Sequence, residues 1–241
     1  MSDDFNEPVT PAEVDDEDEL DDEQDDQEPV RYRGTGSDPT FGYLLALALS
    51  FGLLPLIPYN ADMRFTLAWG VLGLFGVISW LFGTTTRIGR EPLENLAWGV
   101  VFGLIVSAPL LLVGGNTLTT TSHLIFQTGV GGSIQNLSSG TVLAYLVFVM
   151  PLGETLFFRG FMQQNRSFWL VGVLSSVWSI VLFVPMLDVG KYPLVAVIIS
   201  IALVLINLMY GYVRERNGLA AAWACQIVVN FVLLFLPYLT L

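Results

Sequence analysis

The sequence predicts an all-α fold, a polytopic membrane helix bundle with about seven transmembrane helices. Hydrophobic residues make up 53% of the chain. They gather in continuous apolar stretches close to the roughly 20 residues that a helix needs to cross a hydrocarbon core. These stretches lack the alternation of apolar and polar residues that is typical of a membrane β-barrel. In chain order, the predicted spans are 40–58, 65–83, 94–114, 141–163, 168–187, 192–213 and 219–240.

The segment before the first span, residues 1–38, is predicted to be a disordered acidic cytoplasmic tail, and residues 39–241 form the transmembrane bundle. Sixteen of the 22 acidic residues lie between Asp3 and Asp38. A segment of this kind cannot bury enough apolar surface to offset the entropy lost on ordering. Two roles stay open for the tail, a self-repelling solubilising arm or a site for basic partners. We expect no nucleic-acid partner.

Basic residues in the loops predict that the N-terminus lies in the cytoplasm and the C-terminus outside. With this topology, only Arg64 and Lys191 of the ten basic residues lie outside. The predicted location is the cell membrane, crossed several times. The longest loop, about 115–140, is then extracytoplasmic. Its threonine and glycine residues predict a polar loop with turns, in which His123 is solvated.

Polar side chains inside the spans mark the candidate site, because lipid tolerates them poorly. Glu154 lies about 13–14 Å, and Asn230 about 16–17 Å, from the cytoplasmic ends of their spans by helical rise. Gln226 is four residues before Asn230, so both amides share one helical face. The similar depths predict a common polar cavity that opens towards the cytoplasm. Interhelical hydrogen bonding of the amides, or a protonated Glu154, stays open as an alternative.

Other polar groups in the spans are given structural roles. Arg159 lies five residues after Glu154, about 140° further around a helix, so no direct ion pair between the two is predicted. Asn207 in the sixth span and Ser175, Ser176 and Ser179 in the fifth are assigned to hydrogen bonds between helices.

Residues 153–160, Gly-Glu-Thr-Leu-Phe-Phe-Arg-Gly, resemble the first motif of the CAAX-type intramembrane protease family, Glu-Glu-x-x-x-Arg. This family includes type II CAAX prenyl endopeptidases and bacteriocin-processing proteins. Its second motif is Phe-x-x-x-His and its third is His-x-x-x-Asn or Asp. The resemblance covers about 140–235. Three positions match the motifs: Glu154, Arg159 and Asn230. Three depart from them: Thr155 for the second glutamate, Leu187 for the second-motif histidine and Gln226 for the third-motif histidine.

The resemblance implies that Glu154 would activate water for attack on a peptide carbonyl, beside an oxyanion site at Gln226 and Asn230. Leu187 can neither accept a proton nor donate a hydrogen bond, so Glu154 lacks the family's partner base. Gln226 could still donate an N–H group to an oxyanion. One carboxylate beside two amides is a poor zinc site, and we expect neither a metal nor a cofactor.

Two functions follow from these substitutions. The favoured hypothesis is a protein of the CAAX-type protease fold with reduced or lost peptidase activity. It would lie in membrane lipid and bind a membrane-embedded or prenylated peptide, or a partner transmembrane helix. The alternative is an active intramembrane endopeptidase with Glu154 as general base and Gln226 and Asn230 as oxyanion donors. The sequence therefore leaves open whether the protein is an enzyme.

Overall fold

A computed structural model describes residues 39–57, 60–81, 92–130 and 133–240, so the predicted acidic tail lies outside the described residues. The helices and strands, in chain order, are α1 Pro39–Gly52, η2 Leu54–Leu56, α2 Ala61–Leu81, α3 Leu93–Ile125, β1 Gln127–Val130, β2 Ser133–Asn136, α4 Ser139–Ala144, η3 Tyr145–Val149, α5 Met150–Glu154, η4 Thr155–Met162, α6 Gln163–Asn165, α7 Phe168–Phe183, η5 Val184–Met186, α8 Pro193–Asn217, α9 Leu219–Asn230, η6 Phe231–Phe235 and α10 Leu236–Tyr238. Elements η2 and η5 are 3₁₀ helices, and η3, η4 and η6 are π-helical.

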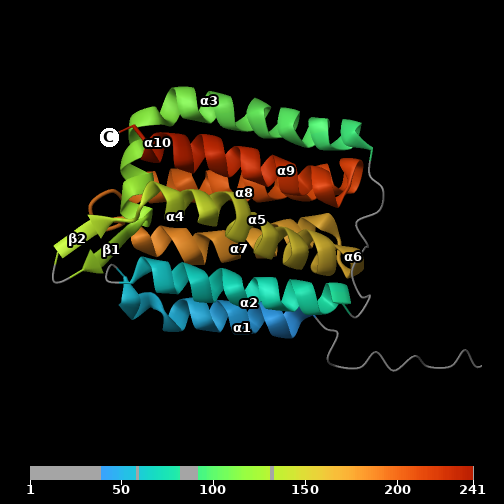
Figure 1. The fold of residues 1–241 in the computed structure, drawn as a ribbon, viewed down its shortest axis with the longest axis horizontal. Coiled ribbons are helices and arrows are strands. Elements are labelled where there is room, and N and C mark those ends of the chain that lie inside the picture. Colours follow the sequence, from blue (N-terminus) through green and yellow to red (C-terminus); the bar gives the residue numbers. More distant parts are fainter. Residues whose placement is uncertain (1–38, 58–59, 82–91, 131–132, 241) are drawn as a thin grey trace, which may run out of the picture. The chain divides into compact units, whose positions relative to one another are not determined.

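The elements form a bundle of long helices, which confirms the predicted all-α polytopic membrane fold (Figure 1). Within the described ranges, six helical stretches are long and apolar enough to cross a membrane: 61–81, 93–125, 139–162, 168–186, 193–217 and 219–238. Helix α1 is apolar but has only 14 residues. Helices are expected here because lipid offers no partner for a backbone N–H or C=O group.

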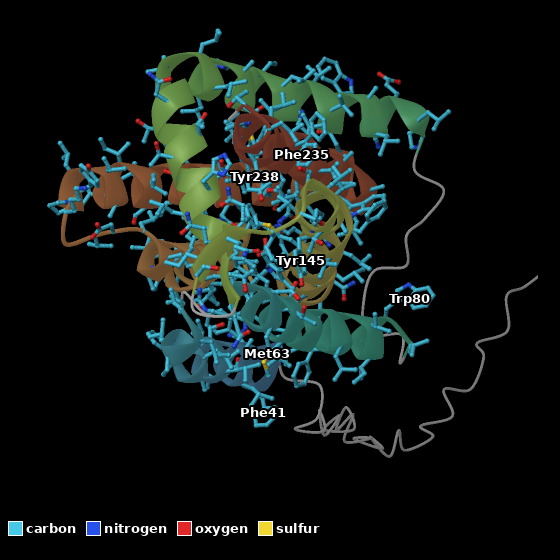
Figure 2. The ribbon with its side chains drawn as sticks, turned by 60° about the vertical axis from the view of Figure 1, so that its left-hand side comes forward. Phe41, Met63, Trp80, Tyr145, Phe235 and Tyr238 are labelled. Atoms are coloured by element: carbon cyan, nitrogen blue, oxygen red, sulfur yellow. The ribbon has the colours of Figure 1, made fainter. Side chains whose placement is uncertain are left out.

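The outer surface of the bundle is apolar, as a surface in contact with lipid must be. Leu112 and Val113 on α3 expose 86% and 91% of their surface. Figure 2 shows Phe41 and Trp80 at the outside of the bundle, whereas Tyr145 lies among the helices. The protein is therefore a multi-pass membrane protein. The side of the membrane on which each terminus lies stays a prediction.

The third span is longer than predicted. Helix α3 continues to Ile125, well past the predicted end at residue 114 (Figure 1). Hydroxyl groups of the threonine-rich run have partners within the helix itself: Thr120 donates to the Asn116 carbonyl and Ser122 to the Thr119 carbonyl. His123 is therefore not a solvated loop residue. It is a half-buried helical residue whose ring lies 4.7 Å from that of Tyr238.

The predicted polar loop is reduced to an antiparallel hairpin. Strands β1 and β2 pair Gln127 with Asn136 and Val130 with Ser133. The predicted turn at the glycines falls at residues 131–132, which lie outside the described residues. The loop prediction was wrong over 115–125.

The buried side chain of Arg64 on α2 forms hydrogen bonds to the end of the fifth span. Pro185 has no N–H group to donate to the Val181 carbonyl, and α7 ends there in the short helix η5. Arg64, which is fully buried in α2, donates to the Leu182 carbonyl at 2.8 Å and to the Val181 carbonyl at 3.1 Å. Arg64 was predicted to lie in an outer loop. It lies instead in the first turn of α2 and satisfies the carbonyls that the helix end leaves free.

Candidate functional site

The carboxylate of Glu154 lies at the centre of the bundle. Glu154 ends α5 and is 1% exposed. Gly153 brings this helix against α2, because a Cβ atom at 153 would lie only 3.0 Å from the Trp69 carbonyl oxygen. A side chain at position 153 would push the two helices apart. The glycine before Glu154 therefore places the carboxylate beside the indole of Trp69.

Three N–H groups from three different helices donate to this carboxylate. The indole Nε1 atoms of Trp69 on α2 and Trp178 on α7 both lie 3.0 Å from Glu154 Oε1. The Nε2 atom of Gln226 on α9 lies 2.6 Å from Glu154 Oε2. Both oxygens therefore accept hydrogen bonds, two at Oε1 and one at Oε2. Hydrogen bonds of this kind are what allows a carboxylate to be buried.

The orientation of the Gln226 amide is fixed by a neighbour. Thr155 Oγ1 donates to Gln226 Oε1 at 2.9 Å, so the amide nitrogen of Gln226 faces Glu154. Thr155 and Gln226 stand at two substituted motif positions. Here they form a chain of hydrogen bonds that ends on the carboxylate.

Arg159 is buried without a direct ion pair. It is 1% exposed in η4, and its Nη2 donates to Asn207 Oδ1 on α8 at 2.8 Å. Its guanidinium carbon lies 5.1 Å from the centre of the Tyr210 ring, within reach of a cation–π interaction. Among the described residues, no ion pair joins Arg159 to Glu154, and Nη1 has no hydrogen-bond partner. The structure buries Arg159 in the bundle.

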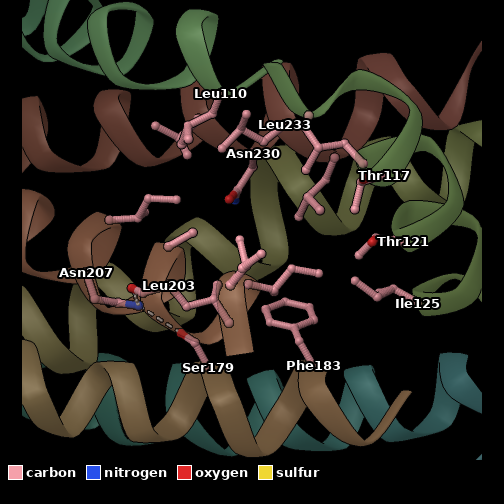
Figure 3. Close-up of a pocket in the computed structure, with 18 of the residues that line it drawn as sticks. Leu110, Thr117, Thr121, Ile125, Ser179, Phe183, Leu203, Asn207, Asn230 and Leu233 are labelled. Carbon is pink, nitrogen blue, oxygen red and sulfur yellow. Dashed lines mark hydrogen bonds between the residues drawn. The ribbon is translucent and has the colours of Figure 1, made fainter. Parts of the chain in front are cut away.

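Asn207 links Arg159 to the fifth span. Its Nδ2 donates to Ser179 Oγ at 3.0 Å, the dashed line in Figure 3, and also to the Leu203 carbonyl. Ser175 and Ser176 instead donate to the Gly172 carbonyl within their own helix. Asn207 and Ser179 thus form an interhelical bond, as assigned from the sequence, but on the same network as Arg159.

Asn230 faces a different partner from Gln226. Its Nδ2 donates to the Leu146 carbonyl at 3.0 Å and approaches Met150 Sδ at 3.4 Å. It therefore ties the last span to the fourth, where η3 interrupts the α-helical pattern. The π-helical element η6 starts directly after Asn230, and η4 directly after Glu154. Helical segments of this type are frequent at functional sites.

Trp178, rather than Leu187, occupies the place beside Glu154. Leu187 follows η5 at the end of the fifth span, where its half-buried side chain packs against the hydrophobic core. The two indole donors, Trp69 and Trp178, were missed by the sequence analysis. One general rule points to them: the N–H group of a buried tryptophan usually has a hydrogen-bond partner. This rule does not say which tryptophan donates to which group.

A cavity of about 290 Å³ lies next to the carboxylate (Figure 3). Glu154 and Asn230 both line it, but most of its wall is apolar, with Leu110, Phe183 and Leu233 among the lining residues. The predicted polar character of this cavity was therefore wrong. The spans are continuous apolar helices, so apolar side chains form most of the wall, and the few polar groups that reach it already have hydrogen-bond partners within the bundle.

The cavity lies towards the end of the bundle that carries the hairpin. Its wall is formed by the second half of α3, by α8 from near its N-terminal end to Tyr210, and by the end of the last span. In the predicted topology this is the outer half of the membrane; the side of the membrane towards which the cavity opens stays a prediction. The lining residues Val113 and Ile198 are 91% and 57% exposed, which places an opening on the lipid-facing surface between α3 and α8.

No metal site is formed by the described part of the chain. There, no three histidine, cysteine, aspartate or glutamate residues lie close enough together to hold an ion. The chemistry available at the site is therefore that of one carboxylate, two amides, one guanidinium and two indole donors.

Comparison with known proteins identifies the segment that carries the site. Residues 136–232 match the family model "Type II CAAX prenyl endopeptidase Rce1-like". Neither a curated protein nor a solved structure matches the chain. The matched segment contains Glu154, Arg159, Gln226 and Asn230, and it confirms the family resemblance that rests on residues 140–235.

Proposed function

We propose that this membrane protein keeps the fold of the type II CAAX prenyl endopeptidases but has reduced or lost peptidase activity. Residues 136–232 belong to the Rce1-like family of these enzymes. In this role it would bind a membrane-embedded or prenylated peptide, or a partner transmembrane helix, without cutting it. One observation carries the proposal: both oxygens of Glu154 accept N–H groups from neighbouring side chains.

A general base must have a lone pair within reach of the water that it deprotonates. Glu154 Oε1 accepts two indole N–H groups and Oε2 accepts one amide N–H group, so three of the about four acceptor positions of the carboxylate are taken and one remains on Oε2. Trp178 cannot replace a histidine partner, because an indole donates a hydrogen bond and never accepts a proton. Loss of assisted proton transfer lowers a rate by about 10²–10⁴-fold.

The amide donors are also engaged. Gln226 donates to Glu154, and Asn230 donates to a backbone carbonyl and approaches a thioether sulfur. An oxyanion site needs N–H groups that point at the position where the negative charge develops. Asn230 Nδ2 has two contacts and would have to leave one of them first, whereas Gln226 Nε2 uses one of its two N–H groups on Glu154. This supports a structural role for Gln226 and Asn230 over an oxyanion-binding role.

The binding part of the proposal rests on the cavity. A space of about 290 Å³, walled mainly by apolar side chains and carrying a few polar groups, has the character of a site for a small apolar ligand. Its opening faces lipid, so a ligand that resides in the membrane could enter it.

The alternative function, an active intramembrane endopeptidase, is favoured by one specific observation. Glu154 and Asn230 line the same cavity, so a bound carbonyl could lie near both. In that case, Glu154 would act as base and the amides of Gln226 and Asn230 would turn towards the oxyanion during the reaction.

A cleavage and binding assay tests the two functions. Protein in lipid nanodiscs is mixed with a panel of membrane-embedded and prenylated peptides, and products are followed by mass spectrometry. We expect no cleavage above that of Glu154→Ala, together with retention of at least one peptide. Glu215→Ala, an exposed carboxylate on α8, is the matched control. Cleavage that is lost in Glu154→Ala and kept in Glu215→Ala would establish the alternative. Absence of both cleavage and peptide retention would refute the binding role.

A further inference from the structure

The cavity beside Glu154 is long and narrow. Along α8 its wall runs from Val195 to Tyr210, about 22 Å by helical rise. Figure 3 shows Asn207 at one end of the space and Ile125 at the other. The volume is only about 290 Å³. One turn of a helix, about 10–12 Å wide and 5.4 Å long, already needs roughly 400 Å³ or more. The space therefore has room for a single extended chain and none for a helix.

The wall calls for no polar group from a ligand. Glu154, Asn207 and Asn230 reach it, and each already has hydrogen-bond partners within the bundle. The rest of the wall is mainly apolar. A peptide carries an N–H and a C=O group at every residue, and these need partners when they are buried. A peptide would therefore have to break existing hydrogen bonds on entry, whereas a hydrocarbon chain leaves all of them intact.

The cavity opens to the surrounding lipid. Val113 on α3 and Ile198 on α8 line it and are 91% and 57% exposed. Water is not a suitable occupant, since an apolar cavity of roughly 150 Å³ stays dry and takes up apolar molecules instead. An unfilled cavity lowers stability, because the atoms that line it lose contacts. The molecules present at the opening that can fill the space are the lipids of the bilayer.

The length and position of the cavity fit one lipid chain. Val195 lies two residues after Pro193, where α8 begins, so one end of the cavity lies near the end of a span. The hydrocarbon core is about 30 Å thick, so the chains of one leaflet extend over about 15 Å. A chain that enters at this end can therefore lie in the cavity over its whole length. Its far end would reach Met150 and Val229, which lie next to Glu154 and Asn230 on the wall.

We infer that one hydrocarbon chain of a bilayer lipid occupies this cavity in the resting protein, with the headgroup outside the bundle at the end where α8 begins. The chain end lies against Met150 and Val229. A peptide ligand has to displace this chain, so lipid occupancy competes with the ligand of the proposed function. The inference concerns the same cavity but does not rest on that function, because the chain is bound even if no peptide is.

Photolabelling of the full chain in nanodiscs tests the inference. The bilayer is phosphatidylcholine with a small share of the same lipid carrying a diazirine at the end of one acyl chain, and no peptide is added. After irradiation, mass spectrometry locates the adducts. We expect them on Met150 and Val229, which line the cavity and are only 5% and 3% exposed. Leu72 and Phe157 are also buried but do not line the cavity, and they should carry none.

Two neighbouring glycines of α3 supply a matched pair of variants. Gly114 lines the cavity, and the nearest side chain that a Cβ atom there would meet is Leu118, at 3.6 Å. Gly115 does not line the cavity, and a Cβ atom there meets no atom within 4 Å. Gly114→Phe adds a ring to the cavity wall. It should lower the adducts on Met150 several-fold and leave those on the lipid-facing Leu205 unchanged. Gly115→Phe should change neither.

Several results would overturn the inference. Adducts confined to exposed residues such as Leu205 would mean that no lipid chain enters the cavity. Equal labelling of Leu72 and Met150 would mean that the probe enters the bundle without a defined site. Equal effects of the two glycine variants would place the chain elsewhere. If Gly114→Phe does not fold, the comparison of Met150 with Leu72 on the unaltered chain still decides.

A second probe separates this ligand from that of the proposed function. It is a peptide whose prenyl chain carries the diazirine. Labelling of Met150 by this peptide, where the lipid probe gives none, would assign the cavity to a prenyl chain and contradict the inference. Labelling by the lipid probe in a protein that retains no peptide would support the inference while the proposed binding role fails.

Discussion

A carboxylate inside a membrane bundle must find donors, and Glu154 finds them on three other helices. Trp69, Trp178 and Gln226 each contribute one N–H group. These donors do not compete with Glu154 for protons, so they hold the carboxylate without taking part in acid–base chemistry. The same three bonds join α2, α7 and α9 at one point. The hydrogen bonds around Glu154 therefore hold helices together as well as forming the candidate site.

The bond from Trp178 to Glu154 should be measurable as a coupling energy. In a double-mutant cycle of Trp178→Phe and Glu154→Met, we expect a coupling of about 1–3 kcal/mol in the free energy of unfolding, because a buried hydrogen bond is removed. The cycle cancels the loss of packing that either substitution causes alone. Denaturant unfolding in detergent micelles gives the four free energies.

Trp223→Phe is the control for this cycle, since the indole nitrogen of Trp223 has no hydrogen-bond partner among the described residues. Its coupling to Glu154→Met should be zero within about 0.5 kcal/mol. Equal coupling for Trp178 and Trp223 would mean that the hydrogen bond to Glu154 contributes nothing to stability.

The charged and amide members of the site could be predicted from the sequence, because a carboxylate or amide in an apolar span is conspicuous. Its indole donors could not, since tryptophan is an ordinary residue of a membrane helix. The direction in which the indole N–H group of a tryptophan points depends on tertiary packing. Leu187 was placed at the site by motif spacing alone. The fifth span ends at Pro185, so Leu187 falls beyond the helix and Trp178 faces Glu154 instead.

Helices α3 and α9 approach each other closely at two glycines of α3. A Cβ atom at Gly99 would lie 2.2 Å from the Ala221 carbonyl oxygen, and one at Gly103 would lie 2.8 Å from Val228 Cβ. Small residues four apart let the backbones of membrane helices come into contact. Helix α9 also carries Gln226, so this contact helps to set the position of the donor to Glu154.

Substitution of Gly99 should therefore weaken the bundle. We expect Gly99→Ala to lower the free energy of unfolding by about 1–3 kcal/mol, because the new methyl group overlaps backbone atoms that cannot move independently. Gly115→Ala in the same helix is the matched control, since a Cβ atom there meets no atom within 4 Å. It should be neutral or stabilising by up to about 1 kcal/mol, as alanine favours a helix over glycine. Thermal unfolding in micelles distinguishes them, and equal shifts for both variants would contradict the packing argument.

The spans themselves could be predicted because continuous apolarity is a strong signal, and six of the seven predicted stretches correspond to long apolar helices. The extent of α3 could not be predicted. Threonine and serine near residues 117–122 are typical of loops, and only their bonds to preceding carbonyls show that the helix can continue. The Gly99 and Gly103 contact has a visible sequence pattern, but the pattern does not say which helix it faces.

For the whole molecule, the short helix α1 determines whether the two termini lie on opposite sides. Its 14 residues span about 21 Å, against a hydrocarbon core of about 30 Å. The 3₁₀ helix η2 follows after one residue and extends the apolar segment. If this segment crosses the membrane, the chain crosses seven times and the termini lie on opposite sides. If it does not, six crossings put both on the same side.

Cysteine labelling of intact cells decides between these topologies. Cys225 is the only cysteine and is buried, so Cys225→Ala provides a background without thiols. Single cysteines are then introduced as Ser37→Cys, Lys191→Cys and Glu215→Cys.

Basic residues concentrate on the cytoplasmic side of membrane proteins. We therefore expect a membrane-impermeant maleimide to label Lys191→Cys on intact cells, and the other two only after permeabilisation. Labelling of Ser37→Cys from outside, with Glu215→Cys protected, would show that α1 does not cross the membrane. Labelling of Glu215→Cys from outside would invert the predicted orientation.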